Sequence, residues 1–318
     1  MNRRKFFSHG ANALVLAAVA PGAVARAGNQ EKPKSISEAK AHHQQLRADS
    51  IPNRSIKKAI MWGTVGVKGS VLEKMKAIKE AGFAGTEMMS HMDQDEVLRA
   101  RDETGLVIPS VCGAHHWSKP LSDPNPKVRE EGLEALKQTL RDAKRYGATS
   151  VLLVPAVVNK EVSYSDAYTR SQSEIRKAVP LAEELGVKIA VENVWNQFLL
   201  SPLEAARYVD EFNSPAVGWH FDVGNVITFG WPEQWIRILG KRIQKLHIKE
   251  YSRKKRDNEG LWKGFDVPYL EGDNDWPAIM KALDDIGYNG WGIAEQGGGD
   301  SLEGLKDLSM RMSKIFAS

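Results

Sequence analysis

The chain has 318 residues, of which 42% are hydrophobic and 26% are charged, and its single cysteine is Cys112. This composition excludes a collagen-like, a disulfide-stapled and a disordered chain. The length suits either two ordinary domains or one α/β barrel of about 250 residues. The formal net charge of +4 comes from four cations within residues 1–27, which contain no acid. The rest of the chain has equal numbers of basic and acidic side chains and therefore no formal net charge, which argues against a basic face that binds nucleic acid.

Residues 1–27 are typical of a secretory signal peptide. They combine a cationic start, a short apolar stretch and a small-x-small site at which a signal peptidase would cut near Ala27. Paired Arg3 and Arg4, followed by Lys-Phe-Phe, resemble the twin-arginine type, with a Sec signal as the alternative. The apolar stretch is too short for about 30 Å of hydrocarbon, which argues against a stable membrane anchor. We therefore expect a bacterial protein that is periplasmic or otherwise exported.

After this signal, residues 28–55 are polar and are interpreted as an N-terminal arm or linker, with a helical tendency at 36–48. From residue 56 to residue 318, short β-rich runs alternate with long amphipathic helical patterns. Glycine stops such as Gly147 and Gly186 close several of the helical patterns. The predicted strands are 56–62, 84–89, 107–113, 149–154, 187–193, 216–222, 243–248 and 290–295. The predicted helices are 69–81, 93–104, 125–147, 164–185, 201–211, 231–240, 275–286 and 300–316.

Strict alternation of strands and helices requires a parallel sheet, because each crossover must return the chain to the same end. Eight such units favour one closed (β/α)8 TIM barrel in the α/β class, as a single domain. An open doubly wound sheet is the alternative. However, the segment after the first predicted strand, 62–66, lacks a Gly-x-Gly-x-x-Gly turn, so we expect no nucleotide cofactor. The long segment 249–274 is expected to be functional, because extended loops at a barrel top usually are.

Four polar side chains end adjacent predicted strands, where a barrel places its active site. They are Glu192, Asp222, His247 and Glu295. Three converging carboxylates would repel one another unless a cation neutralised them. Oxygen donors with one nitrogen and no thiolate suit Mn²⁺, Mg²⁺ or Co²⁺ better than a structural Zn²⁺. Taken singly, each residue would be read as an ordinary strand-end side chain, but their shared position predicts a metal site.

These residues lie in motifs that resemble the xylose isomerase-like barrel superfamily of sugar phosphate isomerases and epimerases. That superfamily includes ketose 3-epimerases, hydroxypyruvate isomerases, inosose dehydratases and endonuclease IV. The likeness covers roughly residues 56–316 and is fairly specific for the superfamily, but it says little about the substrate. The motifs that carry it are Val191-Glu192-Asn193, Phe221-Asp222-Val223-Gly224-Asn225, Leu246-His247-Ile248-Lys249-Glu250 and Ala294-Glu295, with Gly82 to Glu87 and Leu121 to Arg129 in support.

The resemblance implies a divalent ion held by Glu192, Asp222, His247 and Glu295, with Glu192 and Glu295 also acting as the catalytic acid-base pair. A cation that polarises a carbonyl acidifies the neighbouring C–H bond. One carboxylate can then remove that proton to form an enediolate, and the other can return a proton. We therefore expect proton abstraction next to a carbonyl as the elementary step.

The chain departs from the ketose epimerases at two substrate contacts. Asn225 stands where they place a histidine, and Phe198 stands where they place a carboxylate. Arg253 matches an arginine that follows their strand-seven histidine. These changes leave the superfamily assignment standing and leave a free-ketose epimerase assignment open.

Further residues are expected to contact substrate together with Asn225 and Arg253. Trp62 ends the first predicted strand and is read either as a stacking platform for a sugar or as a core indole. Glu87 is expected to point into the barrel top or to pair with a cation. His116 follows the third strand, and Lys249 is placed to neutralise an anionic intermediate.

The sequence thus predicts a secreted, metal-dependent isomerase or epimerase that acts on a keto-sugar or a related polyol. The nearest alternative is a lyase or dehydratase that acts on keto-glycosides or an inosose through the same site. A non-catalytic carbohydrate-binding barrel is a second alternative, and the paired glutamates argue against it. An endonuclease IV-like phosphodiesterase is disfavoured because the chain lacks a basic face and has few histidines. The expected binding partner is a small-molecule carbohydrate, and we expect no binding of nucleic acid. The sequence is compatible with a homo-oligomer.

Overall fold

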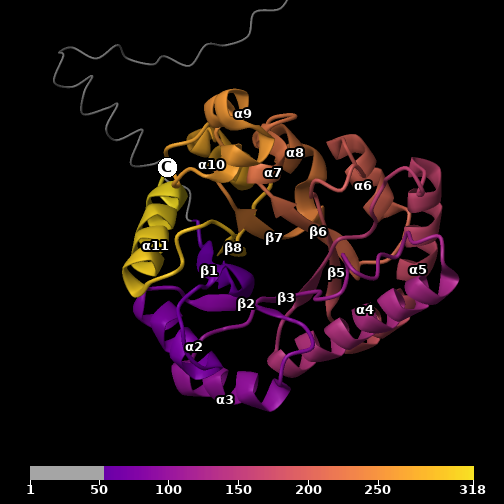
Figure 1. The fold of residues 1–318 in the computed structure, drawn as a ribbon, viewed down its shortest axis with the longest axis horizontal. Helices are drawn as coiled ribbons and strands as arrows, with labels where there is room; N and C mark the ends of the chain where they lie inside the picture. The colour runs from indigo at the N-terminus through magenta and orange to yellow at the C-terminus, as the bar shows by residue number, and fades with distance from the viewer. Residues whose placement is uncertain (1–53) are drawn as a thin grey trace, which may run out of the picture. The chain divides into compact units, whose positions relative to one another are not determined.

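The computed structural model describes residues 54–318. The predicted signal peptide, residues 1–27, and all but the end of the predicted arm lie outside the described residues. Eight parallel strands close into a barrel in sequence order, which confirms the predicted (β/α)8 fold (Figure 1). The strands are β1 (Lys57–Met61), β2 (Gly85–Met89), β3 (Ser110–Cys112), β4 (Ser150–Leu153), β5 (Lys188–Glu192), β6 (Val217–Asp222), β7 (Ile243–Ile248) and β8 (Trp291–Ala294).

Each predicted helix is present outside the barrel, with ends that differ from the prediction by at most two residues. Figure 1 looks along the barrel and shows the helices as a ring around the strands. They are α2 (Val71–Glu80), α3 (Gln94–Thr104), α4 (Pro126–Tyr146), α5 (Tyr164–Leu185), α6 (Pro202–Asp210), α8 (Pro232–Leu239), α10 (Trp276–Asp285) and α11 (Leu302–Phe316). The sequence patterns missed the short helices α7 (Gly224–Ile227) and α9 (Arg253–Glu259) and the 3₁₀ turns η1 (Trp62–Thr64), η2 (Gly240–Arg242) and η3 (Leu261–Phe265).

Local chemistry explains where the long helices begin and end. Ser70 and Glu73 form a reciprocal capping box at the start of α2. At their other ends, α4 and α5 stop at Gly147 and Gly186, which have φ of 77° and 65°. A residue with a Cβ rarely adopts this left-handed conformation, so both glycines end their helices at the predicted positions.

The core lies between the barrel and the inner faces of these helices. Leu133, Leu136, Leu140 and Ala143 of α4 are all buried, as their three- and four-residue spacing predicts. Cys112, at the end of β3, is buried and unpaired. Among residues 54–318, no helix is both long and apolar enough to span a bilayer.

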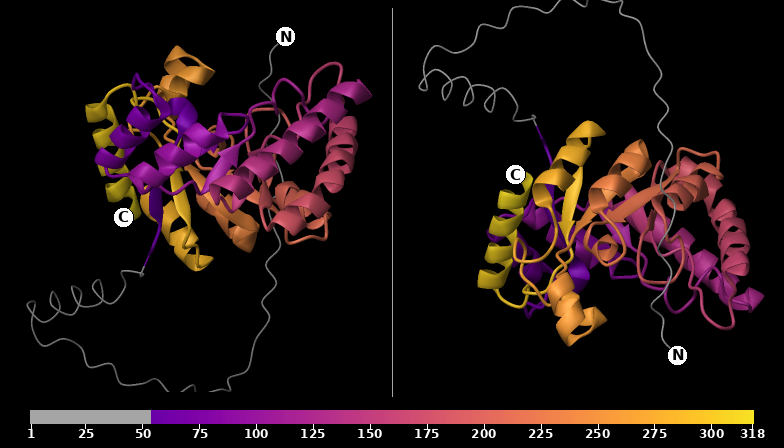
Figure 2. Two further views of the ribbon diagram at one scale, coloured as in Figure 1. Left: turned by 90° about the horizontal axis from the view of Figure 1, so that it is seen from below. Right: turned by 90° about the horizontal axis from the view of Figure 1, so that it is seen from above.

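The segment 249–274 is an ordered excursion between β7 and α10 that contains α9 and η3. Figure 2 shows α9 projecting from the end of the barrel opposite to the end at which β1 starts. The buried carboxylate of Glu250 organises this segment by accepting hydrogen bonds from the Leu270 amide at 2.8 Å, the Asn274 amide at 3.2 Å and the Trp276 indole at 2.8 Å. The strands point their C-terminal ends toward this segment, so it lies over the candidate site.

Candidate metal and acid-base site

The four predicted ligands meet at the C-terminal end of the barrel. Glu192 and Asp222 are the last residues of β5 and β6, His247 lies in β7, and Glu295 directly follows β8. The register aligns Asp222 with His247, because the neighbouring strands are parallel and paired at these residues. One potential ligand atom from each of the four lies within 4.8 Å of the others. The structure therefore brings together the complete predicted ligand set.

The site has the charge and the donors that a divalent cation requires. Asp222 is fully buried, His247 and Glu192 are almost fully buried, and the Glu295 side chain is 21% exposed. Lys249 donates to Asp222 Oδ2 at 3.2 Å and to Glu295 Oε2 at 2.6 Å. This ammonium offsets the charge of one of the three carboxylates. Burial would lower the pKa of His247, but Glu295, Glu87 and Glu192 outweigh burial and raise that pKa well above its ordinary value. A divalent ion would replace the positive charge of the proton that His247 then gives up, and three carboxylates with one imidazole suit such an ion.

Burial and neighbouring charges shift the pKa values of the three carboxylates in different directions. Desolvation raises the pKa of Glu192 to about 7, although His247 opposes this shift. Desolvation also raises the pKa of Asp222 to about 6, against the attraction of Lys249. Burial acts in the same sense on Glu295, but Lys249 and His247 outweigh it and hold its pKa well below the usual range. The two glutamates therefore occupy electrostatically distinct environments within one site.

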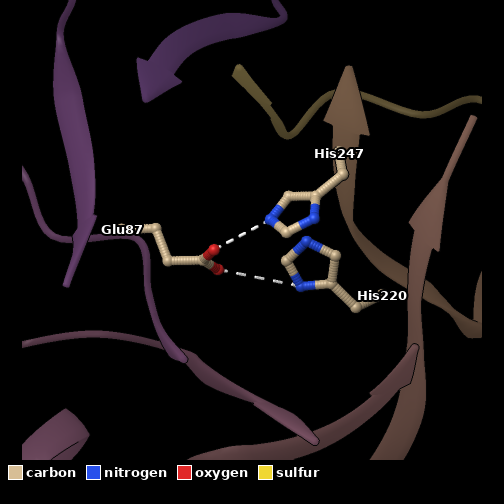
Figure 3. A group of neighbouring side chains, drawn as sticks. All are labelled: Glu87, His220 and His247. Atoms are coloured by element: carbon tan, nitrogen blue, oxygen red, sulfur yellow. Dashed lines mark hydrogen bonds and ion pairs between the residues drawn. The ribbon is translucent and has the colours of Figure 1, made fainter. Parts of the chain in front are cut away.

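His247 is oriented by a carboxylate on the far side of its ring. Its Nδ1 lies 2.9 Å from Glu192 Oε1 and 3.2 Å from Glu295 Oε2, so this nitrogen faces the ligand cluster. Its Nε2 lies 2.8 Å from Glu87 Oε2 (Figure 3). Glu87 is completely buried and also accepts a hydrogen bond from the hydroxyl of Ser110. A proton on Nε2, donated to Glu87, leaves the Nδ1 lone pair free for a cation.

A second imidazole lies beneath this pair inside the barrel. His220 is fully buried, its ring centroid is 4.2 Å from that of His247, and its Nδ1 is 3.9 Å from Glu87 Oε1 (Figure 3). Neither ring nitrogen of His220 has a hydrogen-bond partner among the described residues. Burial, together with His247 and Lys245, holds the pKa of His220 well below its ordinary value, so its ring is neutral.

A cavity of about 450 Å³ opens above the ligand cluster. Residues from several loops line it together with Glu192, His247 and Glu295. The other lining residues are Met61, Met89, Cys112, Gly113, Ala114, His116, Trp117, Leu152, Val194, Trp195, Asn225, Lys249, Trp262 and Phe265. A larger and more open hollow of about 770 Å³ lies over α5 and α6 and contains none of the predicted ligands.

Three of the predicted substrate-binding residues line this cavity. His116 accepts a hydrogen bond from the Val154 amide at 3.3 Å through Nδ1, and burial lowers its pKa to about 4. Asn225 donates from its side chain to the carbonyl oxygen of Asn193 at 3.0 Å. Lys249 lies two residues after His247, so the strand pleat turns both side chains toward the cavity.

The other three are not among the lining residues. Trp62 packs against the core under the ammonium of Lys74, 5.3 Å from the ring centroid. Glu87 is sealed beneath His247, as described above. Arg253 donates to the carbonyl oxygens of Ile227 at 3.0 Å and Gly230 at 3.2 Å, which ties α9 to the end of α7 and to the segment after it.

Sequence reasoning missed several residues of the site. His220 and Lys245 precede Asp222 and His247 by two positions, so extending the alternation of each strand inward would have placed them in the barrel interior. Trp195 lies in a loop, and Trp262 and Phe265 lie in the short 3₁₀ turn η3, where no periodic signal marks them.

The protein is a parallel (β/α)8 barrel. At the carboxyl ends of its strands it carries a buried cluster of residues that could hold a metal ion. A family model described as xylose isomerase-like TIM barrel matches residues 75–313, and the chain belongs to this family.

Among curated relatives, an L-ribulose-5-phosphate 3-epimerase of Escherichia coli O1:K1 is 25% identical over 233 residues. The match covers 69% of this chain and 79% of the relative. A homologous epimerase of Shigella flexneri serotype 5b is 26% identical over the same length and coverage.

Solved structures share the fold. The apo 3-keto-D-glucoside 4-epimerase of E. coli superposes with a TM-score of 0.69 at 18% identity, covering 82% of this chain and 98% of that one. A D-psicose 3-epimerase determined in the presence of D-fructose gives a TM-score of 0.68 at 18% identity, covering 83% of this chain and all of that one.

Proposed function

We propose that the protein is a divalent-metal-dependent isomerase or epimerase that moves a proton next to the carbonyl of a keto-sugar or related polyol. One observation carries the proposal: Glu192 and Glu295 offer two carboxylates from separate strands within 4.8 Å of Asp222 and His247. The epimerases among the relatives support the same class of reaction.

In this proposal Glu192, Asp222, His247 and Glu295 hold the ion, with Mn²⁺ as the favoured metal. Such an ion, when bound, would polarise the substrate carbonyl and acidify the adjacent C–H bond. One glutamate removes the proton and the other returns a proton to the opposite face or the neighbouring carbon. Lys249, whose pKa is raised above its ordinary value because Asp222 and Glu295 outweigh the effect of burial, remains cationic and offsets charge on the enediolate.

Deuterium uptake from D₂O, followed by NMR, tests this chemistry on a panel of free ketoses, inososes and keto-glycosides. With Mn²⁺-loaded protein we expect exchange at a carbon next to the carbonyl. Glu192→Gln and Glu295→Gln should each abolish it, while Glu131→Gln, which changes an exposed glutamate paired with Lys119, should not. Exchange that survives in either of the first two variants would contradict the assigned roles.

Elimination is the second candidate, because the first half of the reaction is shared. Removal of the proton beside a carbonyl, followed by loss of a β-substituent, would make the enzyme a lyase or dehydratase. Asn225 and Phe198 stand where the ketose epimerases have substrate contacts of another type. This difference supports elimination as a candidate reaction. Phe198 is buried against Tyr164 and Tyr168 and is not among the cavity residues.

Product analysis in the same NMR experiment separates epimerisation or isomerisation from elimination. Metal binding without exchange on any panel member would favour a carbohydrate-binding barrel.

We also propose that residues 1–27 direct twin-arginine export to the periplasm and are removed near Ala27. The paired arginines and the small-x-small site in the sequence support this proposal. Replacement of both Arg3 and Arg4 by lysine should block export in a fractionation assay. Unchanged export of that variant would remove the basis for the twin-arginine route.

A further inference from the structure

Aromatic side chains gather along one side of the cavity mouth. The ring centroid of Trp195 lies 4.7 Å from that of Trp262 and 4.8 Å from that of Phe265. Trp195 and Phe265 are half-buried, whereas Trp262 is 67% exposed. Single exposed aromatic side chains are ordinary, but a contiguous group of apolar side chains at a cavity mouth often marks a binding surface. Trp195, Trp262 and Phe265 are called the aromatic platform below.

The platform is built rigidly. Tyr251 is fully buried beneath it, 5.7 Å from Trp195 and 4.8 Å from Phe265 between ring centroids, and its hydroxyl donates to the Leu261 carbonyl at 2.8 Å. A Cβ on Gly264 would come within 2.3 Å of the Tyr251 ring, so only glycine fits there. The Trp195 indole donates to the Asn225 carbonyl at 2.9 Å. A fixed apolar surface loses little conformational entropy when it binds a ligand.

The platform is continuous with the acid-base site. The ammonium of Lys249 lies 5.0 Å from the ring centroid of Phe265 and 2.6 Å from Glu295 Oε2. A group resting on the platform would therefore lie next to a substrate held at the four ligands. Across the cavity, Trp117 is 53% exposed and packs edge-on against His116, with 5.9 Å between ring centroids.

Several polar groups that line the cavity are already engaged within the protein. Asn225 uses its side-chain NH2 group on the Asn193 carbonyl, Lys249 is held by two carboxylates, and His116 Nδ1 is occupied by the Val154 amide. A second ring bound here would therefore be recognised through its C–H face, which stacks well on aromatic side chains.

We propose that the aromatic platform is a second sugar subsite, so that the substrate is a keto-glycoside of at least two rings. The keto ring is held at the four-ligand site, and the glycosidically linked ring stacks on Trp262 and Phe265. This assignment rests on the proposed function for the identity of the first ring and adds the size and class of the substrate.

Binding without turnover tests the subsite separately from the chemistry. The probes are the non-reducing glucosyl disaccharides trehalose and sucrose, compared with methyl glucoside by calorimetric titration of the Mn²⁺-loaded protein. These sugars have no free carbonyl group, so no proton transfer next to a carbonyl interferes with the titration. We expect at least one disaccharide to bind about tenfold or more tightly than methyl glucoside.

Trp262→Ala should remove that preference, and Trp262→Phe should restore part of it. Trp231→Ala is the matched control, because Trp231 is 56% exposed and is not among the cavity residues. Equal binding of methyl glucoside and every disaccharide to the native chain would overturn the proposal, as would a preference that Trp262→Ala leaves intact. Dissociation of an oligomer by Trp262→Ala, without any change in sugar preference, would also overturn it and assign the platform to contact with a second copy.

The subsite and the proposed function fail in different ways. If free ketoses exchange deuterium and no glycoside is preferred, the chemistry stands and the subsite does not. If a disaccharide preference is present but no keto compound exchanges deuterium, the platform stands as a sugar-binding surface and the acid-base proposal fails.

Discussion

His247 Nε2 lies 2.8 Å from Glu87 Oε2, which joins a strand-seven imidazole to a strand-two carboxylate across the inside of the barrel. Glu87 has no exposed surface, and Ser110 donates to its other oxygen. A carboxylate in this position fixes the tautomer and the ring orientation of a metal-binding histidine. Glu87 lies on the side of the His247 ring that faces away from the ligand cluster. It therefore determines which ring nitrogen His247 presents to the cluster.

We predict that Glu87→Gln weakens Mn²⁺ binding by about 10- to 100-fold, because the neutral amide orients His247 less firmly. Glu87→Ala should weaken it at least as much. Competition with a chromophoric chelator measures the affinity, and circular dichroism verifies that each variant is folded. Glu131→Gln, at an exposed glutamate, serves as the control. Native affinity in folded Glu87→Ala would show that Glu87 does not orient His247.

Lys249 holds Glu295 in its ionised form, and its removal should change the pH dependence of the reaction. In Lys249→Gln the pKa of Glu295 rises, because its principal cationic neighbour is gone. Ionised Glu295 is then reached only at higher pH, so the acidic limb of the deuterium-exchange profile should move to higher pH. We expect the maximal rate to fall by about 100-fold.

A pH-rate profile of exchange, measured with saturating Mn²⁺, checks this prediction. Lys281→Gln is the control, since Lys281 is an exposed lysine paired with Asp285 on α10. An acidic limb that stays at the native pH in Lys249→Gln would mean that Lys249 does not set the ionisation of Glu295.

His116 should make stability depend on pH. Burial lowers its pKa from 6.5 to about 4 in the folded chain, so the unfolded chain takes up a proton first as the pH falls. The stabilisation from neutral His116 is complete above pH 6.5 and is lost as the pH falls toward 4. Allowing for partial exposure of the ring, we expect a loss of about 2 kcal/mol over this window.

Denaturant unfolding of native protein and His116→Asn at several pH values measures this contribution. The difference in unfolding free energy between the two proteins should shrink by that amount between pH 7 and pH 4. A difference that stays constant across the window would contradict the burial-driven shift.

Glu250 should determine the stability of the segment 249–274. Glu250→Ala leaves the Trp276 indole and the Leu270 and Asn274 amides without their acceptor, so we expect a loss of about 2 to 4 kcal/mol in unfolding free energy. Glu250→Gln keeps one acceptor oxygen and should cost less. Urea denaturation measures both values, and equal stability of the alanine variant and the native protein would show that other contacts hold the segment.

The sequence by itself determined the barrel and the ligand set. Short β-rich runs, apolar residues at three- and four-residue spacing and glycine stops are local signals, so they placed the eight strands and eight long helices within a few residues. The ligands could be predicted because parallel strands all present their carboxyl ends at one edge, where Glu192, Asp222, His247 and Glu295 each close an apolar run.

Only the tertiary structure decided what surrounds those ligands. Glu87 and His247 are separated by 160 residues in the chain, and their contact depends on how β2 and β7 face each other inside the closed barrel. Trp262 and Phe265 reach the cavity because Glu250 and Tyr251 fold the segment after β7 over the barrel end. Strand periodicity shows which face a side chain occupies, but contacts across the barrel and loop paths depend on closure and packing, which no local pattern encodes.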